Sequence, residues 1–184
     1  VTRRCCGLLV GLAHLRHHVP SGVLKMLVGA LVLPHLQYCI SVFGNGKKGN
    51  LDRLQKVMNF AVRVVSGRRK HDRASDARQR LGWLTAEQLY HHRTLSLLHK
   101  IITAGEPETL AKEFLTNSFV RDRSTRQDSL LHVPRSRLET GKRMFSRRAP
   151  LMYNALPPEC FGAKVPQFNR AVKRHLSDLS PDRN

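Results

Sequence analysis

Few residues of this 184-residue sequence have the types and spacing that catalysis requires. Asp72 and Asp76 are four residues apart and could share one helix face, where two carboxylates could hold a divalent cation. Arg69, Arg73 and Arg80 flank them, however, so local ion pairing is the simpler interpretation. The sequence contains no Asp-Asp or Glu-Asp pair, no P-loop and no Gly-x-Ser-x-Gly elbow. We therefore expect no catalytic residue, metal site or cofactor, and we expect that the chain is not an enzyme.

The cysteines and histidines do not form a metal-binding pattern either. None of the 4 cysteines belongs to a Cys-x-x-Cys pair, and the adjacent Cys5 and Cys6 are interpreted as a buried pair of thiols. His92 and His99 share a face of one predicted helix, but no carboxylate accompanies them at His-Glu-x-x-His spacing. A solvated or half-buried helix face is the expected role of these histidines.

The chemistry that the sequence favours is electrostatic. Its 32 Lys and Arg residues outnumber 13 Asp and Glu residues, for a formal charge of +19. Positive charges in such excess repel one another unless a polyanion binds to the surface, and nucleic acid is the commonest partner of this kind. Hydrophobic residues make up 41%, which excludes a wholly disordered basic tail, whereas 6% aromatic residues argue against a stacking platform for single strands.

The sequence gives no sign of a membrane partner. Its longest apolar run, residues 23–33, contains Lys25 and is shorter than the about 20 residues that a membrane-spanning helix needs. The residues that follow Val1 have the character of mid-domain sequence, so we expect a fragment of a longer protein.

The first half of the chain is predicted to be helical. Helices are expected over residues 1–16 and from an N-cap at Ser21 to Leu31. Pro34 is expected to kink or break the second helix before residues 36–43. Residues 44–49 are predicted to form a loop because glycine alternates there with Asn and Lys. Asn50 can cap the next helix, and Gly67 lies where a left-handed C-terminal cap would sit.

This 50–66 helix is the most informative one. At 100° per residue its apolar side chains share one arc, formed by Leu54, Met58, Ala61, Val62 and Val65. Arg53, Lys56 and Arg63 fall on the opposite side, and the basic run 68–73 follows directly. A solvated face explains such a stripe equally well as contact with phosphates, and both interpretations stay open.

Further helices are predicted over 73–80, from a Thr85-x-x-Gln88 capping box to Gly105, over 108–115, over 144–154 and from Pro166 to Leu176. Residues 116–143 are expected to be extended and weakly ordered, with the apolar run 130–134 packed on the helical body. An apolar anchor is predicted to close this arm onto the body and consists of Phe145, Leu151, Tyr153 and Leu156.

Several sequence blocks together resemble a known family. LKMLVGALVLPHLQYCISVFG, NLDRLQKVMNFAVRVVSG and LGWLTAEQL look like the region just downstream of the reverse transcriptase core in LINE-type (non-LTR) retrotransposons. Phe145-Ser146, Ala149-Pro150 and Asn154-Ala155-Leu156-Pro157 are similar to the C-terminal end of Jockey-like and related elements. Tyr153 stands where that family usually has Trp. The resemblance extends from about Arg3 to Leu176, with the blocks in family order.

The resemblance implies an all-α fold, in which a small helical bundle like a polymerase thumb precedes an extended basic arm and C-terminal helices. The expected divisions are a thumb-like bundle over 1–67, additional helices packed on it over 68–115, an extended basic linker over 116–143 and a C-terminal helical segment over 144–184. The palm domain with its Ala-Asp-Asp motif would lie upstream of Val1. The parent protein would be an RNA-directed DNA polymerase.

We therefore expect a non-catalytic segment that grips the backbone of a primer–template or target nucleic acid, with the upstream palm as its second partner. The expected contacts, chosen by charge and helical phase, are Lys47, Lys48, Arg53, Lys56, Arg63, Arg68, Arg69 and Lys70, and secondarily Arg121, Arg123 and Arg126. Two alternatives remain: a structural module that docks on the palm while its basic surface is merely solvated, or the remnant of a decayed element without selected function.

Overall fold

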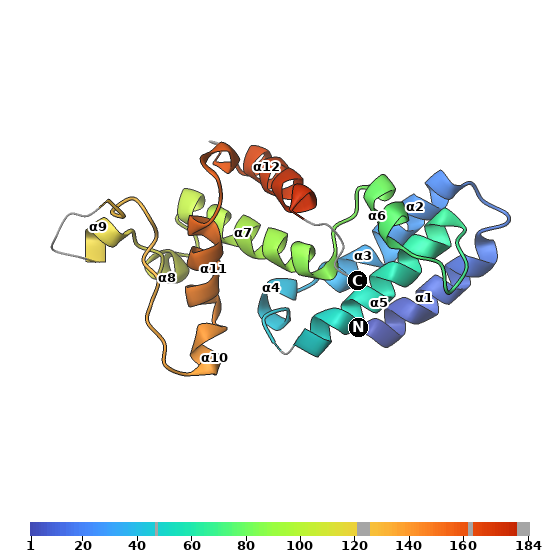
Figure 1. Ribbon diagram of the computed structural model, residues 1–184, viewed down its shortest axis with the longest axis horizontal. Coiled ribbons are helices and arrows are strands. Elements are labelled where there is room, and N and C mark those ends of the chain that lie inside the picture. The colour runs from blue at the N-terminus through green and yellow to red at the C-terminus, as the bar shows by residue number, and fades with distance from the viewer. Residues whose placement is uncertain (47, 121–125, 162–163, 180–184) are drawn as a thin grey trace. The chain divides into compact units, whose positions relative to one another are not determined.

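The computed structural model describes residues 1–46, 48–120, 126–161 and 164–179 (Figure 1). Every regular element in these residues is a helix, which confirms the all-α class, and an isolated bridge between Thr116 and Leu131 is the β pairing among them. The chain divides into two compact units, Val1–Tyr90 and His91–Leu179. Each unit is described by itself below.

The first unit is a bundle built around one long helix, α5 (Lys48–Ser66). Helices α1 (Thr2–Leu15), α2 (Ser21–Leu31) and α6 (Ser75–Leu81) pack against α5. The short helices α3 (Leu33–Gln37) and α4 (Ile40–Phe43) connect α2 to α5 (Figure 1). Helix α7 (Ala86–Ala104) begins in this unit, and its first turns add Leu89 and Tyr90 to the core.

Helix α5 has the predicted apolar face. All five residues of the predicted arc are buried, and Val57 and Val64 are buried as well. The buried arc is wider than predicted because α1 and α2 both pack on this helix. Gly67 has a φ of 66°, so the expected left-handed cap is confirmed. The predicted Asn50 cap is wrong: the helix begins at Lys48, inside the stretch expected to be a loop.

Two further local predictions have opposite outcomes. Ser21 is not the N-cap of α2 but its first residue; the cap position is Pro20, and no side-chain hydrogen bond caps the helix. The capping box before α7 is confirmed on both sides. The backbone N–H of Thr85 donates to Oε1 of Gln88 at 2.8 Å, and the N–H of Gln88 donates to Oγ1 of Thr85 at 3.1 Å.

The second unit is assembled on the C-terminal part of α7. It contains α8 (Glu108–Ala111), α9 (Asn117–Val120), α10 (Glu139–Lys142), α11 (Phe145–Asn154), the 3₁₀ turn η1 (Pro158–Cys160) and α12 (Val165–Asp178). Phe168, Val172 and Leu176 of α12 are buried with Leu95 of α7. A neighbouring cluster joins α7 to the segment between α8 and α11 and to α11 itself, and consists of Leu98, Ile101, Phe114, Leu131 and Ala149.

Residues 116–143 were expected to be extended, but they contain two short helices, α9 and α10, so that expectation is wrong in part. Its apolar run does pack on the helical body, because Leu131 is 6% exposed and lies in the cluster with Phe114 and Ala149. The predicted anchor is confirmed for Leu156, which is buried. It is wrong for Leu151, which is 45% exposed on the outer side of α11.

Candidate nucleic-acid interface

The N-terminal half of α5 carries three of the predicted cationic contacts, and the structure describes the side chains of two of them. Arg53 and Lys56 are exposed, and neither side chain has a hydrogen bond or ion pair with the described part of the chain. Their position follows from helical phase, because the opposite arc of α5 is buried in the bundle. The exposed Asp52 precedes them and reduces the local positive charge.

The basic loop, Arg68–Arg73, follows the C-terminal end of α5. Nε of Arg63 donates to the carbonyl oxygen of Asp72 at 2.9 Å, and Nη1 of Arg68 donates to the carbonyl oxygen of Arg73. A second nitrogen of Arg68 lies 4.0 Å from a carboxylate oxygen of Asp76 in α6. These contacts tie both ends of the loop to the helix that precedes it and to the helix that follows it.

The carboxylate of Asp72 is hydrogen-bonded to the backbone of the loop. Its Oδ2 accepts a hydrogen bond of 2.7 Å from the backbone N–H of Arg69, and the Asp72 N–H donates to the Arg69 carbonyl at 3.2 Å. The loop is therefore a closed turn in which Asp72 holds the backbone. Arg69, Lys70 and Arg73 are left exposed on its surface.

The structure thus separates the predicted cations of the first unit by role. Arg63 and Arg68 are half-buried, and their donors point at backbone carbonyls, so they position the loop. Arg53, Lys56, Arg69 and Lys70 face solvent. Arg53 and Arg63 are ten residues apart on one helix, which corresponds to about 15 Å along its axis.

The remaining predicted contacts fall into two groups. Lys47, Arg121 and Arg123 lie outside the described residues, as does the side chain of Lys48. Arg126 is exposed but belongs to the second unit.

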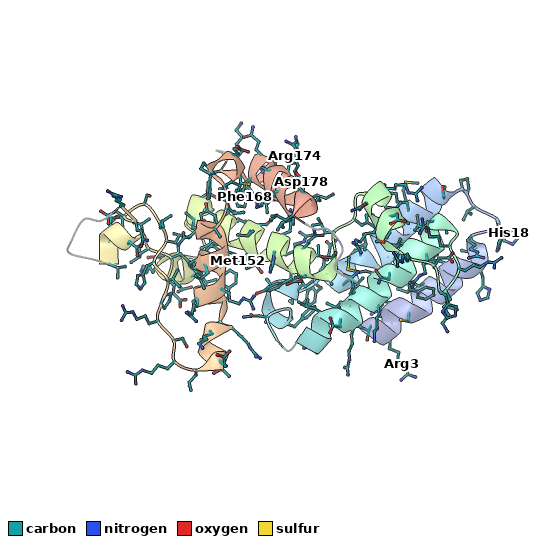
Figure 2. The ribbon with its side chains drawn as sticks, viewed as in Figure 1. Arg3, His18, Met152, Phe168, Arg174 and Asp178 are labelled. Carbon is teal, nitrogen blue, oxygen red and sulfur yellow. The ribbon has the colours of Figure 1, made fainter. Side chains whose placement is uncertain are left out.

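A second cationic face lies on α12 and was missed from the sequence. Arg170, Lys173 and Arg174 are exposed, whereas Phe168 lies on the side of α12 that faces the rest of its unit (Figure 2). The helical-phase argument applied to α5 would have found this face, because apolar residues recur in α12 at positions 168, 172 and 176.

The pKa of His92 in α7 is affected by nearby cations of α7 and α12. Its Nε2 lies 3.1 Å from the carbonyl oxygen of Asn169. Burial lowers the pKa of His92, and the charges of Arg93 and Lys173 lower it further, against the opposing effect of that hydrogen bond. Cations from α7 and α12 therefore act on one imidazole.

His99 is a buried core residue, so the expectation of a solvated or half-buried face is wrong for it. It is 4% exposed, its ring stacks on Phe168 with centroids 3.8 Å apart, and its Nδ1 lies 3.0 Å from the hydroxyl of Tyr153. Burial lowers its pKa below the ordinary value. No group of three or more His, Cys, Asp or Glu residues that could hold a metal ion occurs within the part of the chain that the structure describes.

Comparison with known proteins adds no relative. No family model, no curated protein and no solved structure matches the chain. Among the described helices, none is both long and apolar enough to cross a membrane.

Proposed function

We propose that this chain is a non-catalytic, nucleic-acid-binding part of a LINE-type reverse transcriptase, and that it holds the sugar-phosphate backbone of a duplex. The family assignment rests on the ordered sequence blocks between Arg3 and Leu176. The binding role rests on the charge of +19 and on the exposed cations of the first unit.

The observation that carries the binding role is the tethered basic loop. Arg63 and Arg68 donate hydrogen bonds to carbonyl oxygens of the loop backbone. The other cations of the loop, Arg69, Lys70 and Arg73, are exposed to solvent. A loop that is already ordered loses little conformational freedom when phosphates bind it. Backbone contacts of this kind need charge and position but no base-edge donors, so little sequence specificity is expected.

The affinity should depend steeply on salt. Among the described side chains, the exposed cations of the N-terminal half of α5 and of the basic loop are Arg53, Lys56, Arg69, Lys70 and Arg73. If each neutralises one phosphate, the logarithm of the binding constant falls with the logarithm of salt concentration with a slope of about −4 to −5. Between 50 and 200 mM salt, the affinity would then fall by about 500-fold.

The test is a double charge reversal on the loop. Arg69→Glu with Lys70→Glu should weaken binding to a mixed-sequence duplex by at least about tenfold and make the salt slope shallower by about 2. The matched control is Arg3→Glu with Arg4→Glu, because these are adjacent exposed residues on α1 with the same charge change. Equal losses in the two variants would contradict a localised interface and indicate attraction by net charge alone.

A second candidate function is a docking module for an absent domain. Helices α2 and α4 and the residues between them expose large apolar side chains: Met26 is 68% exposed, and Tyr38 and Val42 are each 75% exposed. Large continuous apolar patches are typical of interaction sites, so these side chains are the candidate contacts with such a domain. Duplex affinity that is unchanged by loop charge reversal would favour this alternative.

A further inference from the structure

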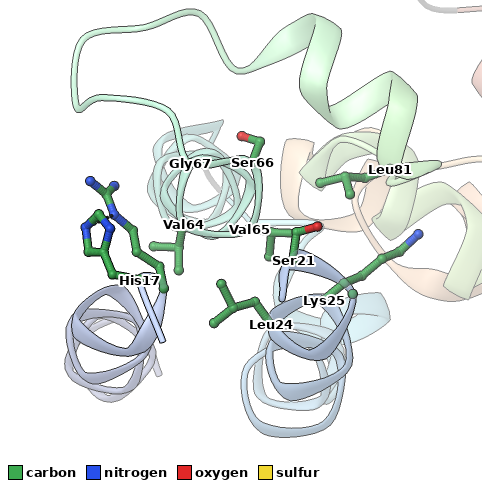
Figure 3. A pocket seen from close by; sticks show the side chains of 11 residues that line it. His17, Ser21, Leu24, Lys25, Val64, Val65, Ser66, Gly67 and Leu81 are labelled. Atoms are coloured by element: carbon green, nitrogen blue, oxygen red, sulfur yellow. Dashed lines mark hydrogen bonds between the residues drawn. The ribbon is translucent and has the colours of Figure 1, made fainter. Parts of the chain in front are cut away.

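An open pocket of about 480 Å³ lies in the first unit beside the start of the basic loop (Figure 3). The end of α1, the start of α2 and the end of α5 surround it, and Leu81 of α6 completes the lining. Its volume falls within the range of sites that bind small molecules, about 300–1,000 Å³.

The floor of the pocket is apolar. Leu24 of α2 and Val64 and Val65 of α5 are buried core residues whose side chains line the space between the two helices (Figure 3). A flat and weakly polar group, such as a nucleobase or the face of a sugar, can cover this surface and exclude water from it.

The rim of the pocket is cationic. Arg16 contributes its charge from the end of α1, where His17 lies beside it, and Lys25 contributes from α2; no acidic residue occurs among the described residues that line the pocket. Nε of Arg16 donates to Nε2 of His17 at 3.1 Å. The guanidinium of Arg16 keeps its two terminal NH₂ groups for a ligand. Guanidinium NH₂ groups suit a phosphate, and Lys25 adds a positive charge on the side of the opening opposite His17 (Figure 3).

We propose that this pocket binds the terminal nucleotide of a strand, with the base or sugar on the apolar floor and a terminal phosphate at the cationic rim. Gly67 links the pocket to the interface described above, because it both lines the pocket and immediately precedes the basic loop. We expect a strand whose backbone contacts Arg69 and Lys70 to end at the pocket. The assignment of the ligand to a strand end rests on the proposed function.

The direct test uses the full chain and three small probes: a nucleoside 5′-monophosphate, the same nucleoside without phosphate, and inorganic phosphate. Titration followed by NMR shifts of the Leu24 and Val64 methyl groups should show the monophosphate binding at least tenfold more tightly than either of the other probes. Equal affinity for inorganic phosphate would overturn the role of the apolar floor. Equal affinity for the bare nucleoside would overturn the role of the rim.

Variants assign the binding to this pocket. Lys25→Gln and Ser21→Trp both replace exposed residues, so the bundle is expected to fold; the first removes a rim charge and the second fills the opening without changing the charge. Each should weaken binding of the monophosphate at least tenfold. Arg3→Gln is the control, since it removes one exposed charge of the same unit away from the pocket and should change the affinity less than twofold. Loss in the control equal to that in Lys25→Gln would overturn the assignment.

Oligonucleotides separate this inference from the proposed function. A duplex with a terminal phosphate should bind better than the same duplex without one, and Ser21→Trp should abolish that difference alone. If the difference is absent while loop charge reversal still weakens binding, the pocket inference is wrong and the proposed function stands. If loop charge reversal has no effect while the monophosphate still binds in the pocket, the proposed backbone interface is wrong.

Discussion

Asn154 provides the sharpest test of the second unit. Its Oδ1 accepts a hydrogen bond from the backbone N–H of Leu131 at 3.0 Å, and its Nδ2 donates to the backbone carbonyl of Leu131 at 2.9 Å. On the opposite side of this segment, His132 and Leu130 pair with the backbone of Leu115 and Asn117. Consecutive residues of an extended chain direct their polar groups to opposite sides, so the Asn154 amide acts in place of a missing neighbouring strand.

The magnitude follows from the two bonds that Asn154→Ala removes. Each bond contributes about 0.5–1.5 kcal/mol, and a buried backbone group without a partner costs about 1–3 kcal/mol. Leu131 is 6% exposed, so water replaces the lost partners poorly. We expect the free energy of unfolding of the second unit to fall by about 2–4 kcal/mol.

The rate of hydrogen exchange at the Leu131 amide measures this loss directly, because the substitution removes the partner of that N–H. A loss of about 2 kcal/mol corresponds to exchange about 30-fold faster. Trp83, the single tryptophan of the chain, lies in the first unit, so its fluorescence reports whether that unit is left unchanged.

Two variants of α11 serve as comparisons. Leu151→Ala removes an exposed side chain from the same helix and should change the unfolding free energy by less than about 0.5 kcal/mol. Asn154→Asp keeps an acceptor for the Leu131 N–H but places a carboxylate against the Leu131 carbonyl, and it should destabilise the unit at least as much as alanine at neutral pH. An Asn154→Ala effect no larger than that of Leu151→Ala would refute the reasoning.

Two further predictions concern the second unit. Burial lowers the pKa of His99 below its ordinary value of 6.5. As the pH falls below about 6.5, the unfolded chain therefore binds more protons than the folded one, and the free energy of unfolding decreases. In denaturation measured between pH 7 and 5, His99→Phe should flatten this loss, and an unchanged slope would contradict the assignment. The triple replacement Arg170→Gln, Lys173→Gln and Arg174→Gln should make the salt slope of duplex binding shallower by about 2–3, whereas Lys112→Gln should leave it unchanged. An unchanged slope in the triple variant would show that the α12 face is only solvated.

The local features were predictable because they depend on neighbouring residues. The Thr85-x-x-Gln88 box, the left-handed Gly67 and the apolar arc of α5 are each encoded within a few turns of helix and are confirmed. The N-cap predictions at Ser21 and Asn50 are wrong, because more than one residue near each helix start could take the cap position. Packing on α1 and α2 also buried more of α5 than its sequence pattern indicated.

The sequence by itself determined the helical class, the excess of positive charge and the separation of apolar from cationic residues along α5. Only the tertiary structure decided which cations are available to a ligand. Arg63 and Lys56 are equivalent by charge and helical phase, yet Arg63 bonds the carbonyl of Asp72 while Lys56 faces solvent. The physical reason is that this hydrogen bond closes across the basic loop, so it depends on where the loop returns between α5 and α6. That return depends on the packing of whole helices, which no short stretch of sequence encodes.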